Sequence, residues 1–241
     1  MDIMTNNLAN ASTVGYKKEG STSQSFDDVL TVKIKDQSVG MRNVQRLGVK
    51  NLGVKIGENY TDYSQGSFRI TGNTYDLALS GEGFFAIEFT NKAGETDTKY
   101  TRAGQFTLNK DGYLVTEEGD YVLDTQNRRI RLNTLIDSSI TDDGTIYQNG
   151  QAVAKIQVTD FEDYDYLEKY GETYYQPIQG AKTIAAKAQV KSGYLEMANV
   201  QIVSEMVNLI SITRAYESNQ KVVQTIDDTL DVAVNQIGRV Q

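Results

Sequence analysis

Three residue types are missing from this 241-residue sequence, which has no cysteine, no histidine and no tryptophan. Without cysteine there can be no disulfide bond, and without cysteine or histidine there is no thiolate or imidazole ligand for a metal such as zinc. A histidine base and a cysteine nucleophile are excluded for the same reason. A carboxylate pair like that of a glycosidase can be imagined among the many acidic residues, but no cluster in the sequence singles out two of them. We expect a protein that is not an enzyme and that holds neither a metal nor another cofactor.

Long apolar runs and an excess of positive charge are missing as well. No run of about 18 apolar residues occurs, so we expect no direct insertion into a membrane. The N-terminal residues contain neither a basic region nor an apolar one, and we expect no secretory signal peptide. The net charge is −8 and the isoelectric point is about 4.7, which argues against a nucleic-acid partner.

The C-terminal segment 190–241 predicts one long helix. It contains no proline, and no glycine lies between Gly193 and Gly238. At 1.5 Å per residue, about 45 residues would span roughly 68 Å, about twice the width of a small domain. One domain cannot cover such a helix, so we expect its apolar stripe to pack against another helix or against other copies of the chain. The stripe at steps of mostly three and four residues consists of Val203, Met206, Ile210, Tyr216, Val223, Ile226, Leu230, Ala233 and Ile237.

The first 15 residues predict the end of a second helix. Met4, Leu8 and Ala11 are spaced by four and three residues, and Gly15 is typical of the left-handed position that follows a helix. A helix of two turns is marginal alone, so we expect it to pack on the C-terminal helix. Its amide side chains can bond to helix-end backbone groups and to neighbouring subunits. The packing residues predicted here are Asn6, Asn7, Leu8 and Asn10.

Residues 59–189 alternate between apolar and polar types and contain many turn sequences. Short strands between Asp-Gly and Gly turns are typical of an antiparallel barrel or sandwich. The tyrosines of this region fit either half-buried strand positions or interface anchors. We predict an α+β protein in which a β-barrel or β-sandwich head (59–189) is inserted between N- and C-terminal helices that form a coiled-coil-like stem (1–15 and 190–241). Residues 16–58 predict an extended connecting arm.

Two loop motifs look like parts of ligand sites. Gly81-Glu82-Gly83 begins like a dinucleotide fingerprint, but a strand follows it and the third glycine is missing. Asn109-Lys110-Asp111-Gly112 resembles part of a calcium loop, but the bidentate glutamate of such loops does not follow it. Hairpin turns explain both motifs, and we assign no cofactor to either.

Several stretches at both ends and in the middle of the chain form a familiar series. They are NNLANASTVGYK at 6–17, GSFRITGNTYDLALSGEGFF at 66–85, YTRAGQF at 100–106, DGYLV at 111–115, GYLEMANV at 193–200, MVNLI at 206–210 and RAYE at 214–217. In this order they resemble the signatures of the rod and hook family of bacterial flagellar axial proteins, and together they are highly specific.

The resemblance implies a structural subunit of the flagellar basal-body rod, a periplasm-spanning axial structure. In that family the terminal helices form coiled-coil stems in the inner wall of a tube, and the β domain lies outside. The implied partners are other copies of the chain, other rod and hook proteins, and the flagellar type III export apparatus, which needs no cleaved signal peptide. Such an assembly is open-ended, and it transmits torque from the motor to the hook. The modest length and the LEMAN sequence favour a rod protein over a hook protein.

The sequence departs from the family pattern in three places. Met1 falls within the family's N-terminal helix, so we expect the N-terminal part of the stem to be truncated here. Tyr75 stands where many relatives have proline, and residues 37–63 match no signature of the family. An alternative function also fits the helix and the head, namely a β-rich adhesin or carbohydrate-binding head on an oligomeric coiled-coil stalk. That alternative predicts a closed oligomer in place of a tube.

Overall fold

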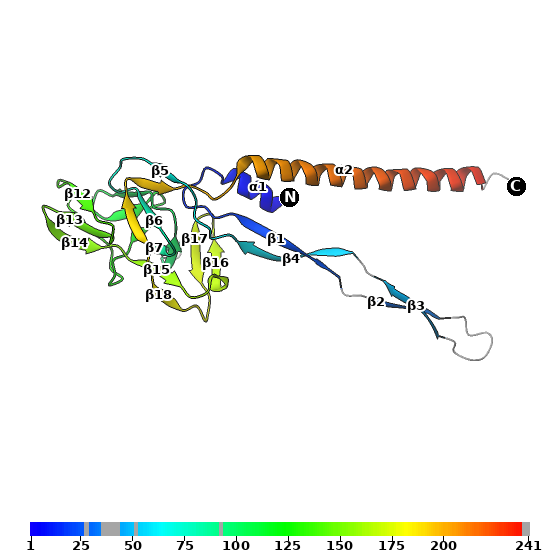
Figure 1. Ribbon diagram of the computed structural model, residues 1–241, viewed down its shortest axis with the longest axis horizontal. Coiled ribbons are helices and arrows are strands. Elements are labelled where there is room, and N and C mark those ends of the chain that lie inside the picture. Colours follow the sequence, from blue (N-terminus) through cyan, green and yellow to red (C-terminus); the bar gives the residue numbers. More distant parts are fainter. Residues whose placement is uncertain (27–28, 35–43, 51–52, 92–93, 238–241) are drawn as a thin grey trace. The chain divides into compact units, whose positions relative to one another are not determined.

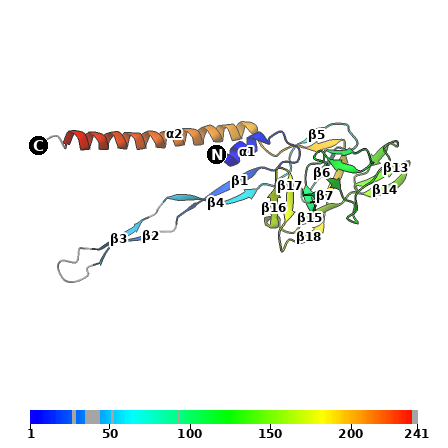
Figure 2. The same ribbon diagram turned by 180° about the vertical axis from the view of Figure 1, so that it is seen from behind.

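The computed structural model describes residues 1–26, 29–34, 44–50, 53–91 and 94–237. The chain forms two compact units; Figure 1 labels many of their elements, and Figure 2 shows them from behind. Unit 1 combines Met1–Lys18 with Tyr63–Gln241, and unit 2 is Glu19–Asp62. The two ends of the chain therefore belong to the same compact unit, although the whole of unit 2 lies between them in sequence.

Unit 2 consists of two antiparallel strand pairs, β1 with β4 and β2 with β3. In the first pair Tyr60 covers Gly20, where an added β-carbon would come within 2.5 Å of the tyrosine ring. Val54 and Ile56 on the same strand as Tyr60 are exposed, as expected for a two-stranded ribbon without a second layer. The strands are β1 (Glu19–Ser25), β2 (Val29–Ile34), β3 (Val44–Lys50) and β4 (Val54–Thr61). Part of the segment 37–63, which matched no signature, falls outside the described residues.

Unit 1 is built around a nine-stranded antiparallel sheet. Seven strands follow the order β16-β17-β8-β7-β11-β10-β9, while β15 pairs with both β7 and β18. The strands of this sheet are β7 (Phe84–Thr90), β8 (Thr96–Thr101), β9 (Phe106–Leu108), β10 (Leu114–Thr116), β11 (Tyr121–Val122), β15 (Val158–Phe161), β16 (Leu167–Tyr170), β17 (Tyr174–Pro177) and β18 (Thr183–Ala185). A short 3₁₀ helix, η1 (Tyr164–Tyr166), precedes β16.

Strand β7 supplies apolar side chains to two cores. Successive residues of a strand point to opposite faces of its sheet, and here Phe84 and Phe85 are both fully buried. Phe84 belongs to an aromatic-rich cluster with Tyr100 and Tyr175, whereas Phe85 belongs to an aliphatic-rich cluster and packs edge-on against Phe106. The sequence Phe-Phe-Ala-Ile thus fills both sides of the sheet, and two of the strand tyrosines serve as core residues.

The remaining strands of unit 1 form one three-stranded sheet, β12-β13-β14, and two antiparallel pairs, β19 with β6 and β20 with β5. The two pairs bring the segment that precedes the long helix onto the head. The bounds are β5 (Phe68–Ile70), β6 (Leu77–Ser80), β12 (Ser138–Ile140), β13 (Thr145–Gln148), β14 (Gln151–Lys155), β19 (Gln189–Ser192) and β20 (Tyr194–Glu196).

The long helix begins later than the sequence predicts. Residues 190–196 are not helical, because Val190 pairs with Leu79 of β6 and Leu195 pairs with Arg69 of β5. Gly193 lies between the two strands with a φ of +82°, which an α-helix does not contain. The helix α2 runs over Ile202–Val232, and a π-helical turn, η2, follows at Ala233–Ile237. The prediction of a helix at residues 190–201 was therefore wrong, it is confirmed over Ile202–Val232, and its last residues, 238–241, lie outside the described residues.

The predicted fold class is partly confirmed. The described strands are paired in antiparallel fashion and accompany a short N-terminal and a long C-terminal helix, as predicted. No closed barrel forms among the described strands. The N-terminal helix α1 (Asp2–Ala9) packs on α2, and Figure 1 shows it beside the start of that helix. A coiled-coil stem and the division into stem, arm and head remain predictions.

Candidate assembly surface

The helix α1 covers only the base of α2. The buried and half-buried positions near the start of α2 are Glu205, Leu209 and Thr213, which are spaced by four residues and so lie on one side of the helix. From residue 214 to residue 232 every side chain of α2 is exposed. An eight-residue helix is about 12 Å long and a 31-residue helix about 46 Å, so one cannot cover the other.

The asparagines predicted on α1 bond within the chain. Asn7 is 1% exposed and accepts a hydrogen bond of 3.0 Å from the hydroxyl of Tyr16. Asn10 ends the helix: its side-chain amide donates to Asn6 Oδ1 at 2.7 Å and to Glu172 Oε2 at 2.6 Å. The Asn10 amide also donates to the backbone carbonyl of Asn6 at 3.1 Å, while bonds from these amides to neighbouring subunits remain a prediction. Leu8, also predicted to pack here, is half-buried.

Buried ion pairs join the two ends of the chain to the head. The Lys17 ammonium group lies 2.7 Å from Glu196 Oε1, and Arg102 Nη1 lies 3.2 Å from Glu196 Oε2. All three side chains are 3% exposed or less. A second pair links Lys18 to Glu205 in the first turn of α2 at 2.6 Å. Sequence reasoning missed this cluster, because single charged residues far apart in a sequence look like ordinary solvated side chains.

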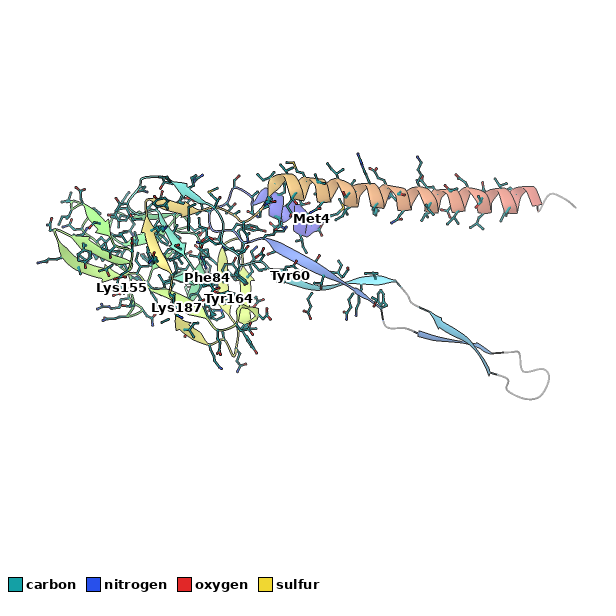
Figure 3. All side chains as sticks on the ribbon, in the orientation of Figure 1. Met4, Tyr60, Phe84, Lys155, Tyr164 and Lys187 are labelled. Atoms are coloured by element: carbon teal, nitrogen blue, oxygen red, sulfur yellow. The ribbon has the colours of Figure 1, made fainter. Side chains whose placement is uncertain are left out.

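The predicted apolar residues of α2 are exposed in the free chain. Figure 3 shows side chains projecting from α2 along the length that extends past α1. Ala233 is half-buried, and the side chain of Ile237 lies outside the described part of the structure. The exposed fractions are 75% for Val203, 47% for Met206, 50% for Ile210, 60% for Tyr216, 57% for Val223, 51% for Ile226 and 57% for Leu230.

The stripe changes side along the helix. At about 100° per residue, Val203 and Val223 point roughly 160° apart. Between the two ends of the stripe, Thr213, Tyr216 and Asn219 follow one another at steps of three residues. Each such step falls about 60° short of a full helical turn, so the row rotates around the helix by about 60° per step. We call Val203, Met206 and Ile210 the proximal patch, and Val223, Ile226 and Leu230 the distal patch. The distal patch lies within about 60° of the direction of buried Glu205, whereas the proximal patch points roughly 100–160° away from it.

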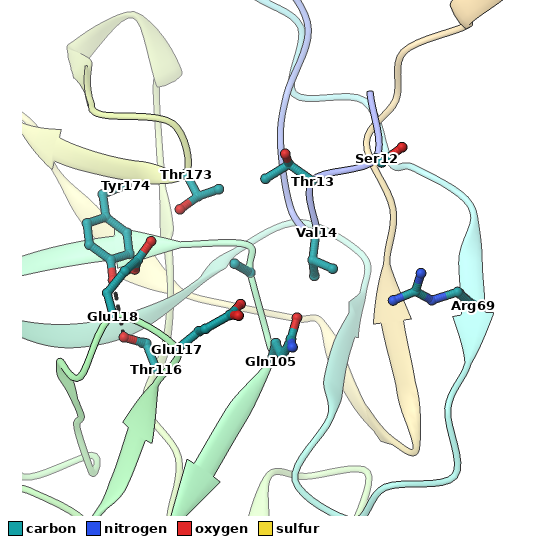
Figure 4. A pocket seen from close by; sticks show the side chains of 11 residues that line it. Ser12, Thr13, Val14, Arg69, Gln105, Thr116, Glu117, Glu118, Thr173 and Tyr174 are labelled. Atoms are coloured by element: carbon teal, nitrogen blue, oxygen red, sulfur yellow. Dashed lines mark hydrogen bonds between the residues drawn. The ribbon is translucent and has the colours of Figure 1, made fainter. Parts of the chain in front are cut away.

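A polar hollow lies where the loop after α1 meets the head. Its volume is about 350 Å³, and its walls include Thr13, Arg69 and Glu117 (Figure 4). At one end the hydroxyl of Tyr174 contacts the carboxylates of Glu118 and Asp120. Burial, followed by the hydrogen bond to Glu118, raises the pKa of Tyr174 far above its usual value.

Two further searches bear on ligands and membranes. Among the described residues, no three acidic side chains gather as they would around a metal ion. None of the described helices is long and apolar enough to cross a membrane. The candidate functional site of unit 1 is therefore the surface of α2, a long helix with two exposed apolar patches.

Comparison with known proteins gives matches along the whole chain. Residues 1–17 match the model of the flagella basal body rod protein family, 78–150 the flagellar hook protein FlgE/F/G D1 domain, and 191–237 the flagellar basal body rod FlgEFG protein C-terminal domain. The flagellar basal-body rod protein FlgG of Bacillus subtilis (strain 168) is 34% identical over 98% of this chain and 92% of its own length. The chain belongs to the family of flagellar basal-body rod proteins.

A second relative supports the same assignment. The flagellar basal-body rod protein FlgF of Caulobacter vibrioides is 33% identical over 100% of this chain and 92% of its own length. As a rod protein of this family, the chain is a structural protein of the flagellar basal body. The N-terminal match contains α1 and Lys17, and the C-terminal match contains Glu196 and α2. Both partners of the buried Lys17–Glu196 ion pair therefore fall within the regions shared with rod proteins.

Proposed function

We propose that this rod protein polymerises through α1 and α2 into the axial tube that transmits torque from the flagellar motor to the hook. The observation that carries the proposal is the exposure of the proximal and distal patches on a helix that extends far past α1. Water-exposed valine, isoleucine and leucine side chains at helical spacing are typical of a surface that another helix covers.

The energy available from these patches suits an assembly of many subunits. Full burial of a valine, leucine or isoleucine side chain contributes about 1.5–3 kcal/mol, and these side chains are about half exposed in the free chain. Each contact residue would then supply roughly 1 kcal/mol. Because the two patches point to different sides of α2, one subunit can contact two neighbours. A contact between two different surfaces can be repeated without closing, as an open-ended tube requires.

We also propose a structural and not a catalytic role, with other rod and hook proteins and the flagellar type III export apparatus as partners. Family membership supports the axial partners, since the relatives are named as rod proteins. Export can be tested in cells that lack a working flagellar export apparatus, where the chain should remain in the cytoplasm. Its appearance outside such cells would contradict this part of the proposal.

Electron microscopy of the purified full chain tests the polymerisation. The proposal predicts filaments or tubes at high protein concentration, and their loss when Val223 and Leu230 are both replaced by aspartate. A matched control replaces Gln224, an exposed polar residue of the same helix, with aspartate. Discrete trimers in place of filaments would contradict the proposal and favour the stalked adhesin, for which the comparisons give no support. Glycan binding by the purified chain would also favour the adhesin.

A further inference from the structure

Arginine and tyrosine side chains stack on one another next to β10 and β11 of the nine-stranded sheet. The Cζ of Arg129 lies 4.3 Å from the centroid of the Tyr121 ring, and the Cζ of Arg131 lies 5.6 Å from that of Tyr113. The two tyrosine rings meet edge to face, with their centroids 5.5 Å apart. Both arginines are exposed, as is Lys110 in the turn before Tyr113. We call these five residues the basic patch.

The stacking holds two guanidinium groups in place at the surface. Arg129 forms an ion pair with Glu88 at 2.5 Å, whereas the Nε of Arg131 donates to the backbone carbonyl of Asp111 at 3.2 Å. Arginine and tyrosine are enriched at the energetic centres of protein interfaces, because a planar cation on a rigid ring loses little freedom on binding. The chemistry that fits the basic patch is therefore the carboxylates of another protein surface.

Acidic side chains gather at the other end of the strand order of this sheet. They lie in the segment 162–168, which contains η1 and the start of β16, and all of them are exposed. Among them stands Tyr166, which is 41% exposed. Lys182 pairs with Glu162 at 3.2 Å, but both of these side chains are more than half exposed. We call this surface the acidic patch, and it consists of Glu162, Asp163, Asp165, Tyr166 and Glu168.

The two patches of one subunit lie too far apart to bind each other. In the order β16-β17-β8-β7-β11, three strands stand between β16 and β11. With neighbouring strands about 4.8 Å apart, the distance across the sheet is roughly 19 Å, which is beyond the reach of a side chain. A partner with carboxylates for the basic patch is therefore another molecule, and a second copy of this chain carries such a surface.

We propose that the basic patch of one head binds the acidic patch of a neighbouring copy. The inference rests on the proposed polymerisation and adds to it a contact between heads, which the stem alone does not provide. Because the two patches differ, a head can bind one neighbour through each, and the contact can be repeated without closing. Complementary charges of this kind fix the orientation of two partners and speed their association more than they raise affinity.

Charge reversal in the full chain tests the contact. Arg131→Glu and Asp165→Lys should each raise the protein concentration needed for polymer formation by about tenfold at low salt, because each places like charges opposite one another. The chain with both substitutions keeps the net charge of −8 and should return to within about threefold of the unchanged chain. Sedimentation of polymer measures all four proteins. Single variants that polymerise like the unchanged chain, or a double variant without recovery, would overturn the inference.

Asp143→Lys is the matched control for Asp165→Lys. Asp143 is exposed in the turn between β12 and β13, outside both patches, and its replacement changes the net charge by the same amount. Polymer formation by this variant should stay within about twofold of the unchanged chain. A control that behaves like Asp165→Lys would mean that overall charge, and not the acidic patch, governs the association, and this would overturn the inference.

A variant with an altered stem separates this inference from the proposed function. Val223→Asp with Leu230→Asp should not polymerise, but its head keeps both patches. Light scattering from a concentrated solution should show attraction between its molecules at low salt that weakens as salt is added, since salt screens charges beyond about 10 Å at 0.1 M. Net charge alone gives the reverse, namely repulsion that is strongest at low salt.

Adding Arg131→Glu to this stem variant should turn the attraction at low salt into repulsion. Repulsion at low salt before that addition would overturn the contact between heads, even where the unchanged chain forms filaments. Attraction that depends on Arg131, in a protein whose unchanged chain forms no filaments, would support the contact between heads and contradict only the polymerisation through α2.

Discussion

Gly15 packs directly against the backbone of Ala103: a β-carbon at position 15 would come within 2.2 Å of the Ala103 nitrogen. Gly15 also has a φ of +70°, in the left-handed region where residues with a β-carbon are strained. The loop after α1 thus crosses the head at a point where only glycine fits. The sequence predicted the left-handed turn, whereas the close approach to Ala103 depends on the fold.

Replacing Gly15 with alanine should therefore destabilise unit 1 by about 3 kcal/mol, through backbone strain and the clash together. Gly94→Ala is the matched control, because Gly94 also has a positive φ, +84°, but open space around its α-carbon. The control should cost only about 1 kcal/mol. Urea unfolding followed by circular dichroism measures both values. Equal losses in the two variants would show that strain alone, and not packing on Ala103, makes Gly15 necessary.

Buried tyrosines predict a loss of stability at alkaline pH. The pKa of Tyr174 is raised by burial and by its hydrogen bond to Glu118, and burial together with Asp160 raises the pKa of Tyr164. The folded state thus holds the proton more tightly than the unfolded state, in which a tyrosine titrates near pH 10. The stabilisation is complete below about pH 10 and is lost as pH rises toward the folded-state pKa, by about 1.4 kcal/mol per pH unit for each such tyrosine.

Tyr174→Phe tests this pH dependence. The free energy of unfolding, measured in urea between about pH 8 and 11, should fall less steeply above pH 10 in the variant, because one of the titrating groups is gone. Tyr164 remains and should leave a residual slope. Parallel pH profiles for the variant and the unchanged chain would contradict the burial of the Tyr174 hydroxyl among Thr116, Glu118 and Asp120.

The exposed patches of α2 predict that folding and assembly respond differently to substitution. Met206→Ser and Leu230→Ser should each lower the free energy of unfolding of the monomer by no more than about 1 kcal/mol, since both side chains are about half exposed. Filament formation should be weakened, most strongly in the double variant. Gln224→Ser should affect neither property. Sedimentation of polymer at increasing protein concentration provides the measurement, and a large loss of monomer stability would place these residues inside the subunit.

Much of the fold follows from local sequence. The helical spacing after Ile202, the turn at Gly15 and the short apolar run of β7 were all visible as local patterns. The strands β19 and β20 were not, because each depends on a partner more than a hundred residues away, as with Val190 and Leu79. Without those partners, a segment free of proline and rich in helix-forming residues looked like the start of the helix.

The candidate surface was predicted better than the contacts that support its base. A helical stripe needs only spacing, so Val203 to Leu230 could be named from the sequence, although the change of side between the patches was not recognised. The cluster at Glu196 joins residues from three distant segments, and no local pattern indicates that Lys17 and Arg102 share one carboxylate. Apart from the structure, the cluster is indicated only by the fact that Lys17 and Glu196 lie within the regions that match rod proteins.

The most direct test of the central claim is the isolation of basal bodies from cells whose only copy of this gene carries Val223→Pro. Proline in the interior of α2 removes a backbone hydrogen bond and clashes with the preceding turn, at a cost of about 3 kcal/mol. The head should stay folded, because neither core cluster contains a residue of α2. The chain should still be exported, but electron micrographs should show no complete rods. Rods of normal length and normal motility in this strain would contradict assembly through the helical stem.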